Sequence, residues 1–149
     1  MKNLLILSLF ILLTSCGYQP LFSSKNVSFS INKINYDNNL NSKKIVNNLK
    51  RYENTESKNF YQISLSTTEQ KNEISKSKKN NLSTYRIIIN AIIKVEKNDN
   101  ILLNKKYIKS FDYLGSEKKF DQSQYEKNLK NSLLDKISNE IIRDLFSIK

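Results

Sequence analysis

Apolar and polar residues alternate in four stretches of the chain, which is the pattern of half-buried β-strands. The predicted strands cover residues 27–38, 60–70, 82–97 and 101–114. Each has one apolar face, formed in chain order by Val27, Phe29 and Ile31; by Tyr61, Ile63, Leu65 and Thr67; by Ile87, Ile89, Ala91, Ile93 and Val95; and by Ile101, Leu103, Tyr107, Phe111 and Tyr113. We expect these faces to line one side of a sheet.

The alternation shifts by one residue within the first strand. Ile31 has an odd number, whereas the next apolar residues, Ile34 and Tyr36, have even numbers. Such a shift turns side chains to the wrong face unless an extra residue absorbs it. We therefore predict a bulge or an irregular break near Asn32 and Lys33.

The third strand is apolar on both faces, because Ile88 and Ile92 lie opposite its main apolar set. This indicates a central strand or a covered second face. The sequence Lys-Asn-Asp-Asn at residues 97–100 predicts a tight hairpin. The polar residues 71–81 predict a hairpin loop or the frayed tips of two strands.

Two segments show helical spacing instead. Residues 42–53 place Ile45, Val46, Leu49 and Tyr52 on one stripe, and Asn41 or Ser42 can cap the helix. In the C-terminal segment, Ser123 and Glu126 have the spacing of a capping box. Its stripe consists of Tyr125, Leu129, Leu133, Ile137, Ile141 and Leu145, widened by Leu134, Ile142 and Phe146. A stripe of this kind can contact a membrane surface or a partner helix, but core packing on the sheet is the favoured interpretation.

The element order is therefore β-α-β-β-β-α. The predicted fold class is α+β: a two-layer sandwich in which a four-stranded, mainly antiparallel sheet carries two helices on one face. Antiparallel hairpins join the last three strands. Residues 27–149 are expected to form a single domain of this type.

The first 15 residues differ from this pattern. One lysine precedes a run of ten almost wholly apolar residues, 4–13, which is about half the length that spans a bilayer. A charged start, a short apolar segment and small residues after it are typical of a secretory signal peptide. The alternatives are a buried core helix or a short membrane anchor.

Cys16 follows this segment within Leu-Thr-Ser-Cys, residues 13–16. The sequence resembles the lipobox of bacterial lipoproteins, in which the cysteine thiol accepts a diacylglyceryl group. By this resemblance, cleavage occurs between Ser15 and Cys16, and residues 16–26 form a lipidated tether. A buried thiol is the alternative, since a chain with one cysteine has no internal disulfide. The residue after the cysteine is Gly17 and not aspartate, which resembles the sorting signal of lipoproteins that reach the outer membrane. The anchor would then lie in the periplasmic leaflet.

Composition narrows the function classes. The chain has a formal net charge of +11 and no histidine. A basic protein can bind nucleic acid, but for an exported lipoprotein anionic lipid or lipopolysaccharide is the favoured partner, so we expect no nucleic-acid partner. Without histidine, and with Cys16 acylated, common metal sites and catalytic triads lack their ligands and bases. We expect no enzyme, cofactor or metal, although a periplasmic enzyme using only carboxylates and lysine remains a rival.

The segment Cys-Gly-Tyr-Gln-Pro-Leu-Phe, residues 16–22, resembles the mature start of alphaproteobacterial lipoproteins of the LptE family. The matching positions are Gly17, Tyr18, Pro20, Leu21 and Phe22, and the element order is also similar to that of the family. The resemblance implies a lipoprotein that plugs and helps to assemble the LptD outer-membrane barrel and assists lipopolysaccharide delivery to the outer leaflet. It implies no catalytic residue. The alternatives are an accessory lipoprotein of another outer-membrane machine, such as barrel assembly, and a structural surface lipoprotein.

One candidate binding patch follows from the order of elements. Three connections, residues 37–41, 71–81 and 115–121, are expected at one end of the sheet. The second and third contain the candidate patch of Lys76, Lys78, Lys79, Lys118 and Lys119. We expect these lysines to attract lipid A phosphates or acidic groups inside the barrel, through long-range and loosely oriented charge. The alternative is a solvated, lysine-rich loop.

Overall fold

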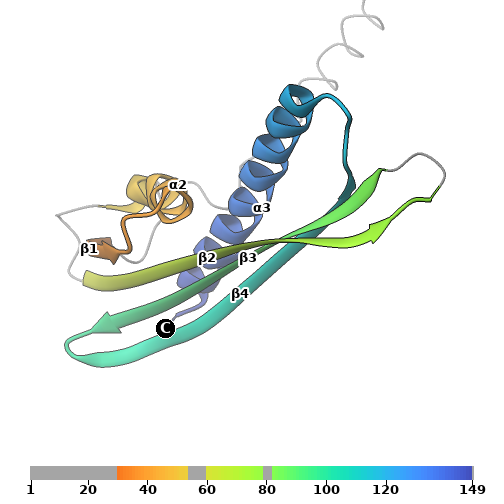
Figure 1. Cartoon of the computed structure of the whole chain (residues 1–149). Helices are drawn as coiled ribbons and strands as arrows, with labels where there is room; N and C mark the ends of the chain where they lie inside the picture. The colour runs from red at the N-terminus through yellow and green to blue at the C-terminus, as the bar shows by residue number, and fades with distance from the viewer. Residues whose placement is uncertain (1–29, 54–59, 79–81, 149) are drawn as a thin grey trace, which may run out of the picture.

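The computed structural model describes residues 30–53, 60–78 and 82–148. Within these ranges the elements are β1 (Ser30–Tyr36), α2 (Leu40–Leu49), the 3-10 helix η2 (Lys50–Tyr52), β2 (Phe60–Lys76), β3 (Ser83–Lys97), β4 (Asn100–Leu114) and α3 (Lys119–Ser147). The strands form one sheet in the order β1-β2-β3-β4, with β1 parallel to β2 and the other pairs antiparallel. Both helices pack on this sheet (Figure 1), so the predicted fold class is confirmed.

The core lies between the sheet and the helices. The inward residues of β2, β3 and α2 are buried as predicted, and so are those of α3 from Leu133 onward. Ile101, at 56% exposure, is the clearest error on β4. A register shift between Val95 and Glu96 pairs Leu103 with Val95 but Ile101 with Glu96, which removes Ile101 from the core. Phe111 is 41% exposed because β4 is the edge strand of the described sheet.

The irregularity predicted in the first strand is present. The pairing of β1 with β2 shifts between Ile31 and Lys33, which leaves Asn32 as the extra residue. Beyond the shift, Ile34 lies beside Ile63 and packs against the core. The bulge therefore lets both isoleucines face the helices.

The first helix starts earlier than predicted, at Leu40, and its cap is Asn39 rather than Asn41 or Ser42. The Asn39 side chain accepts a hydrogen bond from the Ser42 amide at 2.8 Å and donates another to the Thr67 carbonyl at 3.0 Å. Asn39 is the better cap because its hydrogen bond to β2 holds its side chain where it can accept from the first amides of the helix. This contact joins residues 28 positions apart, so the local sequence does not predict it.

The last helix also starts earlier, at Lys119, so Ser123 lies inside it and the predicted capping box is wrong. Glu126 turns toward the sheet instead, where it accepts a hydrogen bond from the Tyr113 hydroxyl at 2.6 Å. The apolar stripe of α3 packs on the sheet, as the core interpretation required, although Tyr125 at its start is 47% exposed.

Of the two hairpin connections, only the first differs in length from its prediction. β2 continues to Lys76, which pairs with Ser83, so residues 71–76 are strand and the loop is shorter than 71–81. Of the two predicted alternatives, strand tips describe this segment better than a loop, although the tips are paired rather than frayed. The second hairpin is as predicted: Asn98 and Asp99 form a two-residue turn with φ of 49° and 64°, the left-handed conformation that such turns require.

Three connections were predicted at one end of the sheet, and the structure places only two of them there. β1 pairs with β2 only as far as Leu65, and the Asp37 amide donates to the Leu65 carbonyl at 3.2 Å. The turn from β1 to α2 therefore lies midway along β2. At the far end, the Gly115 amide donates to the Ser83 carbonyl at 2.8 Å, which places the start of the β4–α3 connection beside the β2–β3 hairpin.

Candidate functional site

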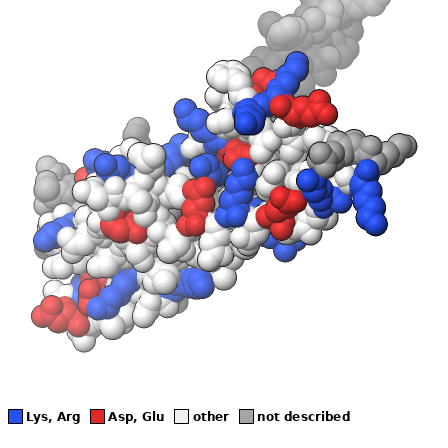
Figure 2. Space-filling view, viewed as in Figure 1, with Lys and Arg blue, Asp and Glu red and all other residues white. Residues whose placement is uncertain are grey.

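The sequence-predicted lysines lie at this far end in two groups. Lys76 ends β2 and Lys78 lies in the following turn, while Lys118 and Lys119 form the N-terminal boundary of α3. Figure 1 shows the β2–β3 hairpin and the start of α3 projecting in different directions, and lysines flank the grey part of the hairpin in Figure 2. Lys79, Ser15 and Cys16 lie outside the described residues. The patch is therefore two neighbouring groups rather than one surface.

These lysines are exposed and can attract anions. All four described side chains are exposed, and none forms an ion pair with another described residue. The backbone amides at the start of a helix carry a partial positive charge, and Lys118 and Lys119 add to it. Asp121 is the acidic residue in that first turn. Because Glu117 and Asp121 balance the charges of Lys118 and Lys119, the uncompensated positive charge at this end lies on the hairpin.

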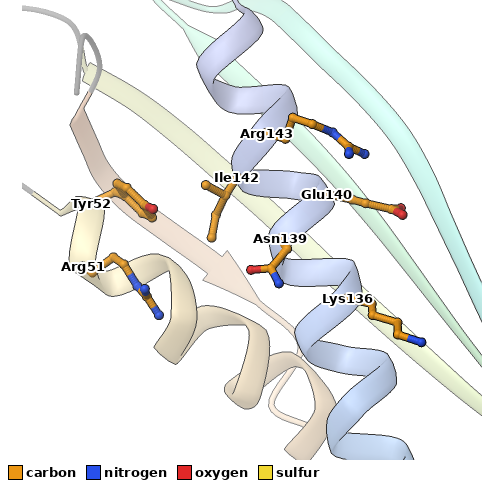
Figure 3. Close-up of a pocket in the computed structure, with 7 residues that line it drawn as sticks. All are labelled: Arg51, Tyr52, Lys136, Asn139, Glu140, Ile142 and Arg143. Atoms are coloured by element: carbon orange, nitrogen blue, oxygen red, sulfur yellow. The ribbon is translucent and has the colours of Figure 1, made fainter. Parts of the chain in front are cut away.

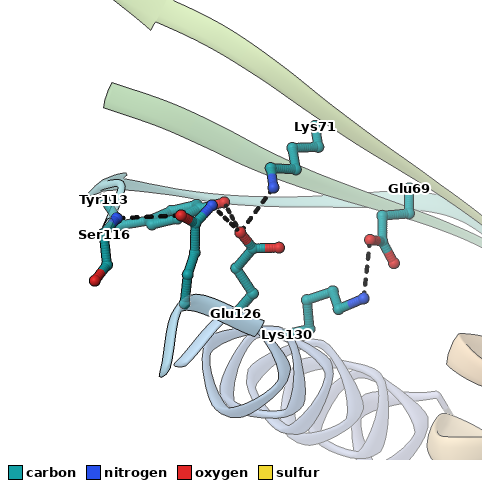
Figure 4. Close-up of polar contacts among 7 residues, drawn as sticks. Glu69, Lys71, Tyr113, Ser116, Glu126 and Lys130 are labelled. Atoms are coloured by element: carbon teal, nitrogen blue, oxygen red, sulfur yellow. Dashed lines mark hydrogen bonds and ion pairs between the residues drawn. The ribbon is translucent and has the colours of Figure 1, made fainter. Parts of the chain in front are cut away.

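A polar cluster behind this end joins α3 to the sheet (Figure 4). Glu126 accepts hydrogen bonds from Tyr113 at 2.6 Å, Lys71 at 2.7 Å and Gln122 at 2.8 Å. The Lys71 ammonium also lies 4.7 Å from the centre of the Tyr85 ring. A hollow of about 460 Å³ borders the cluster. Because its charges are paired with one another, the cluster is better suited to holding α3 than to binding a ligand.

The same contacts shift the ionisation of the cluster. Burial raises the pKa of the Glu126 carboxyl, but the hydrogen bonds from Lys71, Tyr113 and Gln122 outweigh it, so the pKa is lowered. Burial lowers the pKa of Lys71, but its hydrogen bond to Glu126 outweighs this effect and the pKa is raised. Burial, followed by the hydrogen bond to Glu126, raises the pKa of Tyr113 to about 12. The ion pair is thus stable at neutral pH.

We expect Glu126→Gln to make the free energy of unfolding depend less on pH between neutral and acid conditions. A carboxyl whose pKa is lowered by folding stabilises the folded state above its ordinary pKa of 4.5 and loses that contribution as the pH falls further. The variant should be less stable than the wild type at neutral pH, and the difference should shrink below about pH 4.5. Urea unfolding across this range measures it, with Glu117→Gln as an exposed control. A difference that stays constant with pH would contradict the ion pair's role.

A groove of about 520 Å³ lies between η2 and the C-terminal half of α3 (Figure 3). Arg51 and Tyr52 form one wall, and Asn139 and Ile142 face it from α3. The remaining lining residues are Lys136, Glu140 and Arg143, whose side chains extend to the other side of the helix in Figure 3. The cations therefore do not converge on one point, and the groove is not an anion site of defined geometry.

No group of three or more histidine, cysteine, aspartate or glutamate side chains with the spacing of a metal site occurs among residues 30–53, 60–78 and 82–148. In the same part of the chain, no helix is both long and apolar enough to cross a membrane.

Sequence patterns missed the polar cluster. Glu126 lies 55 residues from Lys71 and 13 from Tyr113, so no local spacing links the three. The only local signal was the pairing of Ser123 with Glu126, and it indicated a cap instead. The lysines of the hairpin were found because they follow one another along the chain.

No family model and no curated protein matches the sequence. The fold, however, is similar to solved structures of bacterial lipoproteins. A minor lipoprotein from Acinetobacter baumannii superposes with a TM-score of 0.63 and 11% identity, covering 81% of this chain and 92% of that one. Rare lipoprotein B from Shewanella oneidensis gives 0.61 and 14%, covering 78% and 95%. A putative lipoprotein from Caulobacter crescentus gives 0.58 and 15%, covering 83% and 92%. At these identities the likeness shows a shared fold.

Proposed function

We propose that this chain is an LptE-like outer-membrane lipoprotein, which plugs and helps to assemble an LptD-type barrel and assists lipopolysaccharide delivery. The observation that carries the proposal is the fold. It extends over most of this chain and nearly all of the rare lipoprotein B structure. The lipobox-like sequence at Cys16 and the following start motif support it independently, because they precede the first strand of the fold, which begins at Ser30.

The test is co-purification from outer membranes. A tagged form of the whole chain, extracted in mild detergent, is expected to bring down an LptD-type barrel as the main partner. Recovery of a barrel that belongs to another assembly machine would favour the accessory-lipoprotein alternative. Recovery of no barrel at all would favour a structural surface lipoprotein and contradict the proposal.

The lysines of the far end are part of the same proposal, as the groups that attract phosphates of lipopolysaccharide. Lys76, Lys78 and Lys79 changed together to Gln should lower lipopolysaccharide binding severalfold at low salt, because three long-range attractions are lost. The loss should shrink near physiological salt, where the screening length is about 8 Å. Adding Lys118→Gln and Lys119→Gln should lower binding further.

The matched control is another lysine triple, Lys43, Lys127 and Lys136 changed to Gln on the helix layer, which removes the same total charge. Binding is measured with the folded soluble domain at several salt concentrations. Equal losses for both triples would show that only net charge matters. No loss for the hairpin triple would leave those lysines as solvated surface.

A further inference from the structure

The segment between Cys16 and the fold contains more large apolar residues than a simple spacer needs. Residues 17–24, Gly-Tyr-Gln-Pro-Leu-Phe-Ser-Ser, include Tyr18, Leu21 and Phe22 and carry no charge. Segments that only span a distance are usually rich in glycine, serine, proline or charged residues. Large apolar side chains gathered in a short stretch are typical of a binding surface. The composition therefore indicates that residues 17–24 dock on something.

The path of the chain brings this segment to the groove between η2 and α3. The chain runs along β1 from Ser30 and returns along α2, so that η2, at the end of α2, lies against β1. Figure 1 shows α2 and β1 side by side. η2 supplies Arg51 and Tyr52 to the wall of the groove. The residues that precede Ser30 therefore enter the fold next to this groove.

Chain length limits where Phe22 can lie. Eight residue steps separate Phe22 from Ser30 (30 − 22 = 8), and an extended chain covers at most about 3.6 Å per step, which gives a reach of about 29 Å. Residues 136–143, which line the groove on α3, span only about 11 Å of helix. β2 starts beside Ser30 and, with 17 residues, is about 55 Å long. Phe22 can thus reach the groove but not the far end of the sheet.

The groove combines a fixed aromatic ring with unused hydrogen-bonding groups. The Tyr52 ring packs edge-on against Phe146, with ring centres 5.9 Å apart. Arg51 donates from Nε to the Asn48 carbonyl at 3.0 Å, and its terminal nitrogens have no partner among the described residues. The Asn139 side chain is exposed and makes no hydrogen bond within the described part of the chain. An extended segment supplies carbonyl groups for such donors and aromatic rings that stack on a guanidinium.

The charges around the groove favour an uncharged occupant. Glu140 at its border is held by Lys109 of β4 at 2.5 Å, so a basic peptide would meet no free carboxylate there. The cations of the lining do not converge, so an acidic peptide would not be held at one point. Residues 17–24 have no charge, and Pro20 has no backbone N–H that would need an acceptor. The segment and the groove are therefore matched in their polar groups.

We propose that residues 17–24 dock in the groove between η2 and the C-terminal half of α3, with their aromatic rings against Arg51 and Tyr52. The inference goes beyond the proposed function and requires neither a barrel nor lipopolysaccharide. In the lipidated protein of that proposal, docking holds Cys16 within about 22 Å of Phe22, because six residue steps separate them (22 − 16 = 6). The end of the domain that carries the groove then faces the membrane, and the far end of the sheet points away from it.

Photo-crosslinking within the chain tests where the segment lies. A photoreactive residue replaces Phe22 in the whole chain, purified in mild detergent, and mass spectrometry of the digested monomer locates the products. We expect residues 51–52 and 136–143 to hold at least fivefold more product than Ser64 and Ser66, which line a hollow on the opposite face of the sheet. Products mainly at the two serines, or spread evenly over the surface, would overturn the inference. Products of twice the chain's mass would place the segment on a second copy and also overturn it.

Blocking the groove gives a second readout. Asn139→Trp fills the groove with a large ring and should make chymotrypsin cleave after Phe22 at least fivefold faster than in the wild type, because the displaced segment is accessible. The matched control is Asn128→Trp, at an exposed position of α3 outside the groove, which should leave the cleavage rate unchanged. Equal rates in the two variants would overturn the inference. Neither readout involves a barrel, so the inference and the proposed function can fail separately.

Discussion

Cys16→Ala is expected to abolish fatty-acid incorporation and to release the chain from the membrane fraction. In the lipobox proposed for residues 13–16 the thiol would be the acyl acceptor, and alanine has no nucleophile to replace it. Stable anchoring takes more than one lipid chain, so a residue that carries the diacylglyceryl group controls the whole attachment. The same change should also leave the signal peptide uncleaved, which a shift to higher mass would reveal.

Metabolic labelling with a fatty-acid analogue, followed by fractionation, measures this effect. Ser15→Ala is the control, because it keeps a small residue at the cleavage position and retains Cys16. It should be labelled like the wild type. Equal labelling of Cys16→Ala would show that the anchor lies elsewhere or that the segment is not a lipobox.

Asp37→Ala is expected to destabilise the folded state more than Glu126→Gln, Asp37→Asn or any substitution of Glu117. The Asp37 carboxylate accepts hydrogen bonds from the Thr67 amide at 3.0 Å, from the Asn39 amide group at 2.8 Å and from the Ser42 hydroxyl. It thereby continues the β1–β2 pairing after β1 ends and supports the cap of α2. Ser42 is fully buried and Thr67 only 5% exposed, so their donors would have little access to water after the substitution.

The expected loss is about 3 kcal/mol, since hydrogen bonds to a charged group contribute about 1.5–3 kcal/mol and buried donors left unpaired cost more. That is a large part of the roughly 5–15 kcal/mol by which domains are stable. Urea unfolding measures it. Asp37→Asn keeps one acceptor and should lose less, and the exposed Glu117→Ala should change stability by no more than about 0.5 kcal/mol. A loss below 1 kcal/mol for Asp37→Ala would contradict the network's role.

Alternation and spacing predicted the parts of the fold in which burial dominates. β3 is the clearest case, because Ile87, Ile89 and Ile93 could face only one way in a central strand. The bulge near Asn32 was predictable for the same reason, since burial of both Ile31 and Ile34 requires it. In these elements, each local choice is fixed by which side faces the core.

The errors occurred where a distant contact decided between local alternatives. Asn39 became the cap of α2 because Thr67 holds its side chain, and Glu126 left its expected capping position because Tyr113 and Lys71 bind it. The extension of β2 to Lys76 depended on its pairing with Ser83. None of these contacts leaves a periodic signal in the sequence.

The candidate site was also predictable only in part from the sequence. Lys76 and Lys78 could be identified from sequence because charge runs are local, and the order of elements placed them at one end of the sheet. Their separation from Lys118 and Lys119 depends on the direction in which α3 leaves that end, which sequence does not specify (Figure 1). The sequence predicted that Ile88 and Ile92 lie on the second face of β3, but the position of Ile108 beside them required the register of β4.

Depletion of the chain tests its central role most directly. The protein is removed by controlled expression, and blots follow the barrel and the lipopolysaccharide at the cell surface. If the chain plugs and helps to assemble an LptD-type barrel, the amount of correctly assembled barrel falls, its disulfides where present fail to form in the native pattern, and surface lipopolysaccharide decreases. An LptD-type barrel of unchanged amount and mobility after full depletion, with normal surface lipopolysaccharide, would contradict the proposed function.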